Sequence, residues 1–103
     1  MKEEPVNVKL PAAYHDMICE MCREFESFYK ENEEELGRYS FEINLAADRI
    51  EHNIHSHSDT SQIPQGDILY LLDAIRTLVE YELINEDNIK ELTIFLKNAV
   101  GQK

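Results

Sequence analysis

The chain has 103 residues, of which 43% are hydrophobic, 21 are acidic and 10 are basic, giving a net charge of −11. This length fits one domain with a hydrophobic core of its own, and two cysteines are too few for a disulfide framework. Three glycines and three prolines leave little turn material for an all-β fold. The acidic surplus disfavours nucleic acids and anionic membranes as partners.

No N-terminal apolar segment follows a basic start, so we expect no signal peptide and a cytoplasmic location with reduced thiols. No apolar stretch reaches the ~20 residues that a bilayer requires, so we expect no membrane contact. Residues 1–103 are predicted to form a single acidic helical domain, in which residues 1–10 are an extended arm.

Residues 6–10, VNVKL, alternate apolar and polar side chains. This period of two indicates a short strand or an extended arm. Pro11 follows and suits the first position of a helix, where its missing N–H needs no partner.

Residues 12–36 are predicted to form a long first helix. An apolar stripe recurs in it at spacings of four, three, four and three residues, the pattern of a buried helix face. Its members are Tyr14, Ile18, Met21, Phe25 and Phe28. Four glutamates occupy the distal end, where negative charge opposes the helix dipole. We expect this end to fray unless a basic group meets it, and Gly37 to stop the helix.

Residues 38–45 fit two descriptions, because their apolar residues alternate with polar ones as in a strand, while a helical spacing also runs through them. The helical set is Ile43, Ala47, Ile50 and Ile54. We favour a second helix over residues 40–55 and keep the strand as the alternative. Residues 56–66, rich in Ser, Thr, Asp, Pro and Gly, are predicted to be a loop.

Residues 67–84 are predicted to form the central helix, because their polar residues make one narrow stripe and the remaining surface must be covered. Asp67 is its expected N-cap. Asn85 or Asp87 can cap a last helix over residues 87–100. The predicted fold is all-α: a four-helix bundle with helices at about 12–36, 40–55, 67–84 and 87–100, with a short N-terminal strand at 6–10 as an option.

The negative charge is concentrated locally, since residues 11–37 hold eight acidic and two basic residues, a net charge of −6. Such a surface steers a protein towards a basic partner. We expect a non-catalytic acidic protein-binding module that engages a basic protein through one charged helical rod, with a homodimer as an open option. Nuclease inhibitors (immunity proteins), antitoxins, small secretion chaperones and anti-restriction DNA mimics share this physical profile. The predicted contact residues are Glu20, Glu24, Glu31, Glu33, Glu34 and Glu35.

The segment VNVKLP followed by a helix resembles the start of ribbon-helix-helix repressors, and residues 36–54 are loosely similar to that family's second helix. The resemblance implies a strand that pairs with its dimer mate and places Asn7 and Lys9 against DNA bases. The first helix is longer than is usual in that family, and the net negative charge opposes phosphate contact. A DNA-binding regulator is therefore the alternative function.

Two sets of side chains offer metal-ligand chemistry. In the first set His15, Cys19 and Cys22 lie four and three residues apart, so a helix places them on one side. Imidazole and thiolate are good zinc ligands, but these residues border the apolar stripe, where cysteine is commonly a small buried hydrophobe. The second set is His52, His55, His57 and Asp59.

The segment HSHSD at 55–59 resembles the opening of the metallo-β-lactamase H-x-H-x-D motif. Thr60 stands where that family has a further histidine, and the chain is too short for its two-sheet sandwich, so nothing is carried over. A small metal-binding helical protein is a further alternative. We expect no metal, no cofactor and no enzyme, because the chain has neither a phosphate-binding loop nor a carboxyl in an activating apolar setting.

Overall fold

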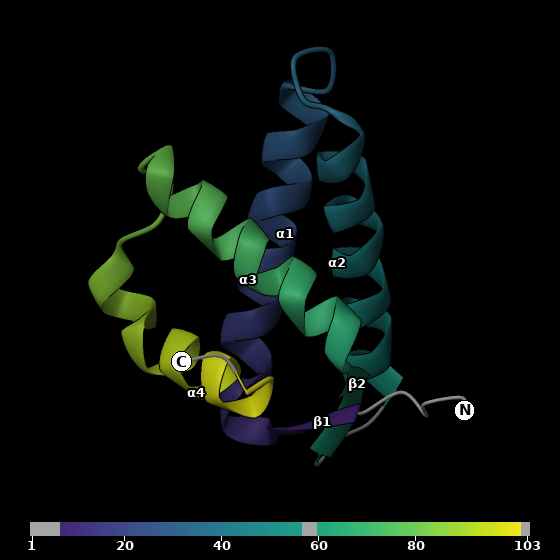
Figure 1. The fold of residues 1–103 in the computed structure, drawn as a ribbon, viewed down its shortest axis with the longest axis vertical. Helices are drawn as coiled ribbons and strands as arrows, with labels where there is room; N and C mark the ends of the chain where they lie inside the picture. Colours follow the sequence, from purple (N-terminus) through teal and green to yellow (C-terminus); the bar gives the residue numbers. More distant parts are fainter. Residues whose placement is uncertain (1–6, 57–59, 102–103) are drawn as a thin grey trace.

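Four α-helices and a two-stranded antiparallel sheet make up the computed structural model, which describes residues 7–56 and 60–101 (Figure 1). The strands are β1 (Asn7–Pro11) and β2 (Thr60–Pro64), and the helices are α1 (His15–Glu31), α2 (Arg38–Ser56), α3 (Gln65–Glu80) and α4 (Lys90–Ala99). Short 3₁₀ turns, η1 (Ala12–Tyr14) and η2 (Glu86–Ile89), precede α1 and α4. The predicted all-α, four-helix fold is confirmed. None of the described helices is long and apolar enough to cross a bilayer.

The helix α3 lies at the centre of the packing, where it crosses the antiparallel pair formed by α1 and α2 (Figure 1). It contacts α1, α2, α4 and both strands, as expected for the most apolar helix. The sheet closes the end of the bundle opposite the turn between α1 and α2 (Figure 1). The largest fully buried side chains are Leu10, Ile18, Cys22, Phe25, Ile50, Ile63, Ile68, Leu78, Leu92 and Leu96.

The strand β2 lies within segment 56–66, and the prediction of a loop is wrong for Thr60–Pro64. It pairs antiparallel with β1, which confirms the N-terminal strand and places Val8 opposite Ile63. Both side chains are buried, so the pairing covers one end of the core. The segment's polar composition hides the strand, because Ile63 is its one large apolar residue and its partner is distant in the sequence.

The helix α1 ends at Glu31, short of the predicted end at Leu36. Asn32 caps it, since its side-chain amide donates a hydrogen bond to the carbonyl oxygen of Phe28 at 2.9 Å. Residues 33–36 then form a turn, in which the backbone N–H of Leu36 donates to the carbonyl oxygen of Asn32 at 3.1 Å. The acidic run favours this early end, because carboxylates are repelled by the negative end of a helix dipole.

The helix α2 includes residues 38–45, so the strand alternative for this segment is wrong. The alternating apolar set stays at the surface, with Tyr39 53%, Phe41 45% and Leu45 41% exposed. Burial of one helical stripe therefore decides the structure of this segment. The buried stripe is Ile43, Ala47, Ile50 and Ile54.

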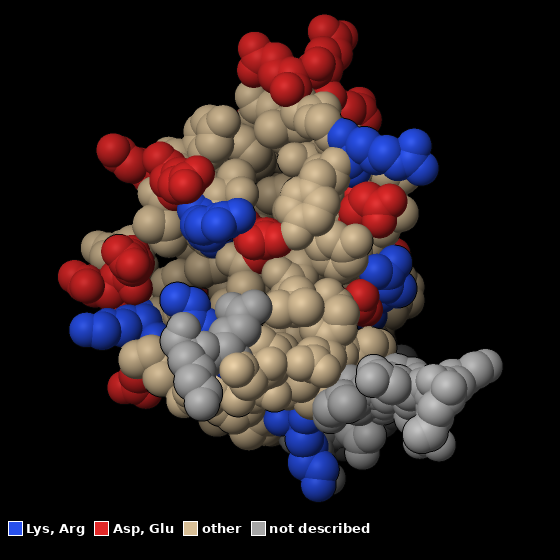
Figure 2. Space-filling model, viewed as in Figure 1, with Lys and Arg blue, Asp and Glu red and all other residues tan. Residues whose placement is uncertain are grey.

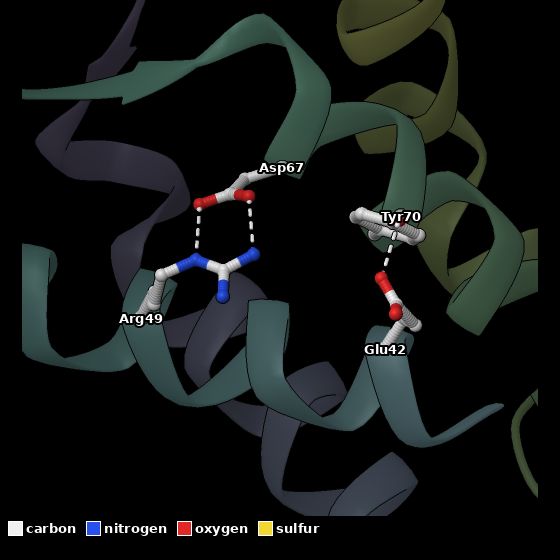
Figure 3. Close-up of polar contacts among 4 residues, drawn as sticks. All are labelled: Glu42, Arg49, Asp67 and Tyr70. Atoms are coloured by element: carbon white, nitrogen blue, oxygen red, sulfur yellow. Dashed lines mark hydrogen bonds and ion pairs between the residues drawn. The ribbon is translucent and has the colours of Figure 1, made fainter. Parts of the chain in front are cut away.

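The helix α3 begins at Gln65, and Asp67 does not act as its N-cap as predicted. Asp67 is buried and instead accepts two hydrogen bonds from Arg49 of α2, at 2.8 and 3.2 Å (Figure 3). The hydroxyl of Tyr70 donates to Glu42, also on α2, at 3.1 Å (Figure 3). A bidentate Arg–carboxylate pair fixes orientation as well as distance, so these contacts help to set how α3 crosses α2.

The helix α3 ends at Glu80, short of the predicted end, because Glu82 turns the chain in the left-handed conformation with a φ of 60°. The backbone N–H of Leu83 donates to the carbonyl oxygen of Leu78 at 2.9 Å, and that of Glu82 donates to the carbonyl oxygen of Val79 at 3.0 Å. This is the Schellman arrangement, whose left-handed position normally favours glycine.

Replacing Glu82 with glycine is expected to raise the free energy of unfolding by about 0.5–1 kcal/mol. The substitution removes a side chain at positive φ, which costs about 1–2 kcal/mol, and the greater entropy of unfolded glycine offsets part of this gain. Urea unfolding measures the difference. Glu86→Gly, where φ is not positive, should destabilise the protein. An unchanged E82G beside a stabilised E86G would contradict this prediction.

Candidate functional site

Two adjoining clefts lie between α1 and the segment formed by residues 81–89. This segment connects α3 to α4 (Figure 1). Their volumes are about 380 Å³ and about 290 Å³. Glu24 and Leu83 line both clefts, so we describe them together as one site, the α1 groove. Further lining residues are Met17, Glu20, Met21, Phe28, Glu31 and Tyr81.

Three of the predicted contact residues form an acidic wall along the α1 groove. Glu20, Glu24 and Glu31 are exposed on α1, four and then seven residues apart. At a rise of 1.5 Å per residue these positions lie about 6 and about 10 Å apart along the helix axis. Such spacings keep them on one side of the helix, so the wall presents negative charges one turn and two turns apart.

The rest of the α1 groove combines apolar side chains with four polar residues, Ser27, Asn32, Asn85 and Asn88. Leu83 is 46% exposed and Tyr81 is 57% exposed, and the Tyr81 ring packs on Phe28 of α1 with the ring centroids 4.8 Å apart. Exposed apolar side chains beside charged ones are typical of protein-binding surfaces. Tyr81 and Leu83 were not among the predicted contact residues, because the central helix was predicted to include both. A helix end predicted near Glu80 would have moved them to the surface.

The other predicted contact residues, Glu33, Glu34 and Glu35, lie on the turn between α1 and α2 rather than on α1. With Lys30 and Glu31 they border a shallow hollow of about 430 Å³, which we call the acidic tip. Figure 2 shows acidic side chains gathered at this end of the molecule. The six glutamates therefore form two sets that share Glu31, and the single charged rod expected from the sequence is not present.

His15, Cys19 and Cys22 share one side of α1 as predicted, but that side faces the core. Nε2 of His15 lies 3.1 Å from the carbonyl oxygen of Leu10, and both thiols are free and buried. Burial raises the pKa of the Cys22 thiol well above its usual value, which opposes the thiolate that a metal requires. Within the part of the chain that the structure describes, no group of three His, Cys, Asp or Glu side chains is placed to hold a metal ion.

The second histidine set lies partly outside the described residues. His52 is exposed on α2, with Nδ1 3.1 Å from the carbonyl oxygen of Asp48. His55 is also exposed near the end of α2. His57 and Asp59 fall outside the described residues, so the alternative of a metal site built on them is not tested.

The strand β1 pairs with β2 of the same chain, whereas the repressor resemblance implies pairing with a dimer mate. Lys9 is exposed, and Val8 and Leu10 on either side of it are buried. Asn7 begins the strand opposite Pro64. The alternation of apolar and polar residues is as predicted, but the resemblance to the repressor family does not extend to this strand pairing.

A pair of carboxyl groups lies between α1 and α2, where Glu26 is hydrogen-bonded to Glu51. Burial, this hydrogen bond and the negative charges of Glu51 and Asp48 raise the pKa of Glu26 from its ordinary 4.5 to about 8. A hydrogen bond between two carboxyl groups requires a shared proton, so the pair retains one near neutral pH. The expectation that no carboxyl group has a setting that raises its pKa is therefore wrong for Glu26. Glu26 does not line the α1 groove.

Raising the pH from about 5 to about 8.5 is expected to lower stability through Glu26. Its pKa is higher in the folded than in the unfolded chain, so its stabilising effect is complete below pH 4.5 and is lost as the pH rises through about 8. Glu26→Gln can keep a hydrogen bond to Glu51 without the proton. It should raise the free energy of unfolding near pH 8.5 by about 1 kcal/mol, a value reduced for the partial exposure of Glu26.

Urea midpoints at both ends of this pH range measure the effect, with Glu34→Gln as the exposed control. The urea midpoint of the E26Q variant should change less with pH than that of the wild type. The midpoint of E34Q should change as the wild-type midpoint does. Parallel pH profiles for E26Q and the wild type would show that the carboxyl pair does not hold the proton.

Comparison of this chain with models of known protein families, with curated proteins and with solved structures found no match. The fold and the site define an all-α, four-helix protein. Its surface carries a groove that has an acidic wall on α1 and, on the facing segment, the exposed apolar side chains of Tyr81 and Leu83 beside Asn85 and Asn88.

Proposed function

We propose that the protein is a non-catalytic binding module that holds a basic protein partner in the α1 groove. One observation carries this proposal. Glu20, Glu24 and Glu31 stand along one wall of a groove whose other side includes the exposed side chains of Tyr81 and Leu83. An acidic surface that serves solubility alone needs no such apolar side.

The charge distribution supports a basic partner. A net charge of −11 attracts a positively charged protein over a distance and accelerates its encounter. The acidic tip adds to this long-range field. Exposed ion pairs contribute only about 0.2–1 kcal/mol each, so we assign the tightness of binding to the apolar side of the groove.

The exposure of the groove carboxylates supports binding rather than catalysis. General acid–base catalysis by a carboxyl group usually requires a desolvated setting that moves its pKa towards neutrality, and Glu20, Glu24 and Glu31 are open to solvent. Two free, buried thiols suit a reducing compartment. We therefore propose that the partner is met in the cytoplasm and that no cofactor takes part.

Neutralising the acidic wall is expected to reduce capture of the basic partner about tenfold. Three variants each remove three carboxylates from exposed positions. The groove set is Glu20→Gln, Glu24→Gln and Glu31→Gln; the tip set is Glu33→Gln, Glu34→Gln and Glu35→Gln; the control set, outside the groove and the tip, is Glu80→Gln, Glu86→Gln and Glu91→Gln. Immobilised wild type and variants are incubated with lysate of the source cells, and retained proteins are identified by mass spectrometry.

Wild type and control set should retain the same basic protein, and the groove set should retain about tenfold less of it, because three ion pairs are lost. The tip set should fall in between, since its carboxylates act mainly at long range. Equal retention by all four proteins would overturn the proposal. So would a wild type that retains no basic protein.

A further inference from the structure

We propose that the occupant of the α1 groove is one amphipathic helix of the basic partner. The helix lays its apolar side against Leu83 and its basic side along the acidic wall. This inference rests on the proposed function and adds the conformation and the residue pattern of the bound segment. Binding of an amphipathic helix in a surface groove is a recurrent mode of peptide recognition.

The length of the α1 groove suits a short helix. The groove extends along α1 from Met17 to Asn32, which corresponds to about 22 Å at a rise of 1.5 Å per residue. A partner helix of about 15 residues spans this length in about four turns. The two clefts, of about 380 and about 290 Å³, can take side chains from one face of such a helix.

The spacing of the wall carboxylates favours a helix over an extended peptide. In a strand, residues advance about 3.3 Å and alternate in direction. The interval of about 6 Å between Glu20 and Glu24 equals two strand residues, which point the same way. The interval of about 10 Å between Glu24 and Glu31 equals the rise of three strand residues, so strand side chains at its two ends point in opposite directions. A helix lying along α1 meets all three carboxylates with basic residues at i, i+4 and i+11.

The apolar part of the α1 groove suits the aliphatic side chains of such a helix. The partly exposed Met17 and the buried Met21 line the first cleft. The unbranched, polarizable side chain of Met17 can adapt to varied partners. Leu83 follows Glu82, whose left-handed backbone is fixed by the turn at the end of α3. A strained backbone conformation persists only where surrounding contacts hold it in place, and such positions are often functional. The conformation of Glu82 directs Leu83 into the groove.

The charge of the chain argues against a second copy as the occupant. Each copy has a net charge of −11, and the acidic wall would add three carboxylates to the contact. Like charges brought together at an interface slow encounter and weaken binding. A basic segment is complementary to the same wall, so we commit to a basic helix from a different protein.

Two synthetic peptides with the same Leu and Lys composition test the inference. In the helical peptide, of about 15 residues, leucines recur every three or four positions and lysines stand at i, i+4 and i+11; the scrambled peptide has no such period. Calorimetry measures binding to the full chain at about 0.15 M salt, and amide chemical shifts locate it. The protein variants are the groove set, Leu83→Gln and Ile94→Gln. Ile94, on α4, is 50% exposed and serves as the matched control for Leu83.

The helical peptide should bind about tenfold more tightly than the scrambled one. Leu83→Gln should weaken the helical peptide about tenfold, because the apolar contact is lost, and Ile94→Gln should leave it unchanged. Chemical shift changes should concentrate in residues 17–32 and 81–89. Met17→Gln tests the same contact from α1 if Leu83→Gln lowers stability.

Equal binding of both peptides, weakened by the groove set and unaffected by Leu83→Gln and Met17→Gln, would overturn the helix inference. The proposed function would then still stand. Binding that does not respond to the groove set, or shift changes confined to other parts of the chain, would overturn the inference and count against the proposed function as well.

Discussion

Alanine at Phe25 is expected to lower the free energy of unfolding by about 3–5 kcal/mol. The Phe25 side chain is fully buried in the core, and its ring centroid lies 6.0 Å from that of Phe28. Its removal loses the transfer free energy of an aromatic ring and leaves a cavity that the surrounding helices fill only in part. Phe28 in turn supports Tyr81, so we expect the loss to loosen the α1 groove as well.

Phe41→Ala is the matched control for this prediction. Phe41 is 45% exposed on α2, and its ring contacts Tyr29 with the centroids 6.4 Å apart. The substitution should lower the free energy of unfolding by about 1 kcal/mol or less, because nearly half of the Phe41 surface already meets water. Urea unfolding followed by circular dichroism gives both values, with unchanged slopes as the test of two-state behaviour. Similar decreases in the free energy of unfolding for the two variants would mean that Phe25 of α1 is not a core residue.

Lysines in place of the three wall carboxylates are expected to lower the association rate constant with the basic partner by about 100-fold at low salt. The substitutions Glu20→Lys, Glu24→Lys and Glu31→Lys change the net charge from −11 to −11 + 3 × 2 = −5. They also place like charges at the contact itself, which slows encounter and destabilises the complex. Stopped-flow mixing at about 0.05 M and about 0.5 M salt should show the difference shrinking as salt screens the charges.

The control for this experiment reverses three exposed carboxylates outside the α1 groove: Glu80→Lys, Glu86→Lys and Glu91→Lys. This variant has the same net charge of −5, so its rate constant reports the general field of the molecule. We expect the association rate constant of this control variant to fall by only a few-fold. Equal decreases for the two variants would show that net charge, and not the acidic wall, governs association.

The helical class and the buried helix faces were predictable because they depend on local periodicity. Ile18 and Phe25 lie in the apolar stripe of the first helix, and both are fully buried. Leu78 shows the same agreement in α3. One buried face stabilises a helix by several kilocalories per mole, which exceeds the differences of about 1 kcal/mol or less in intrinsic propensity.

The helix ends and the second strand were not predictable in this way. The helices α1 and α3 stop at a side-chain cap on Asn32 and at the left-handed backbone of Glu82, and alternatives at helix ends differ by only about 1 kcal/mol. The strand β2 depends on the pairing of Ile63 with Val8, which are far apart in the sequence. Nothing local marks such a pairing in a short polar segment.

The acidic half of the candidate site could be predicted, and the apolar half could not. Counting charges along the chain identifies Glu20, Glu24 and Glu31 without knowledge of the fold. Leu83 and Tyr81 join them only because α3 crosses α1 and its last turn redirects the chain. A groove formed by two distant segments can be predicted only when the tertiary structure is known. A cluster of charge within one segment can be read from the sequence.

The α1 groove contains two of the three methionines of the chain, Met17 and Met21, so methyl NMR can observe its occupancy directly. The protein carries carbon-13 in its methionine methyl groups and is titrated with the basic partner retained in the capture experiment. We predict that the Met17 and Met21 signals shift and saturate together with binding, and that the groove set removes these shifts. Saturated binding that leaves both signals unmoved would contradict the placement of the partner in the α1 groove.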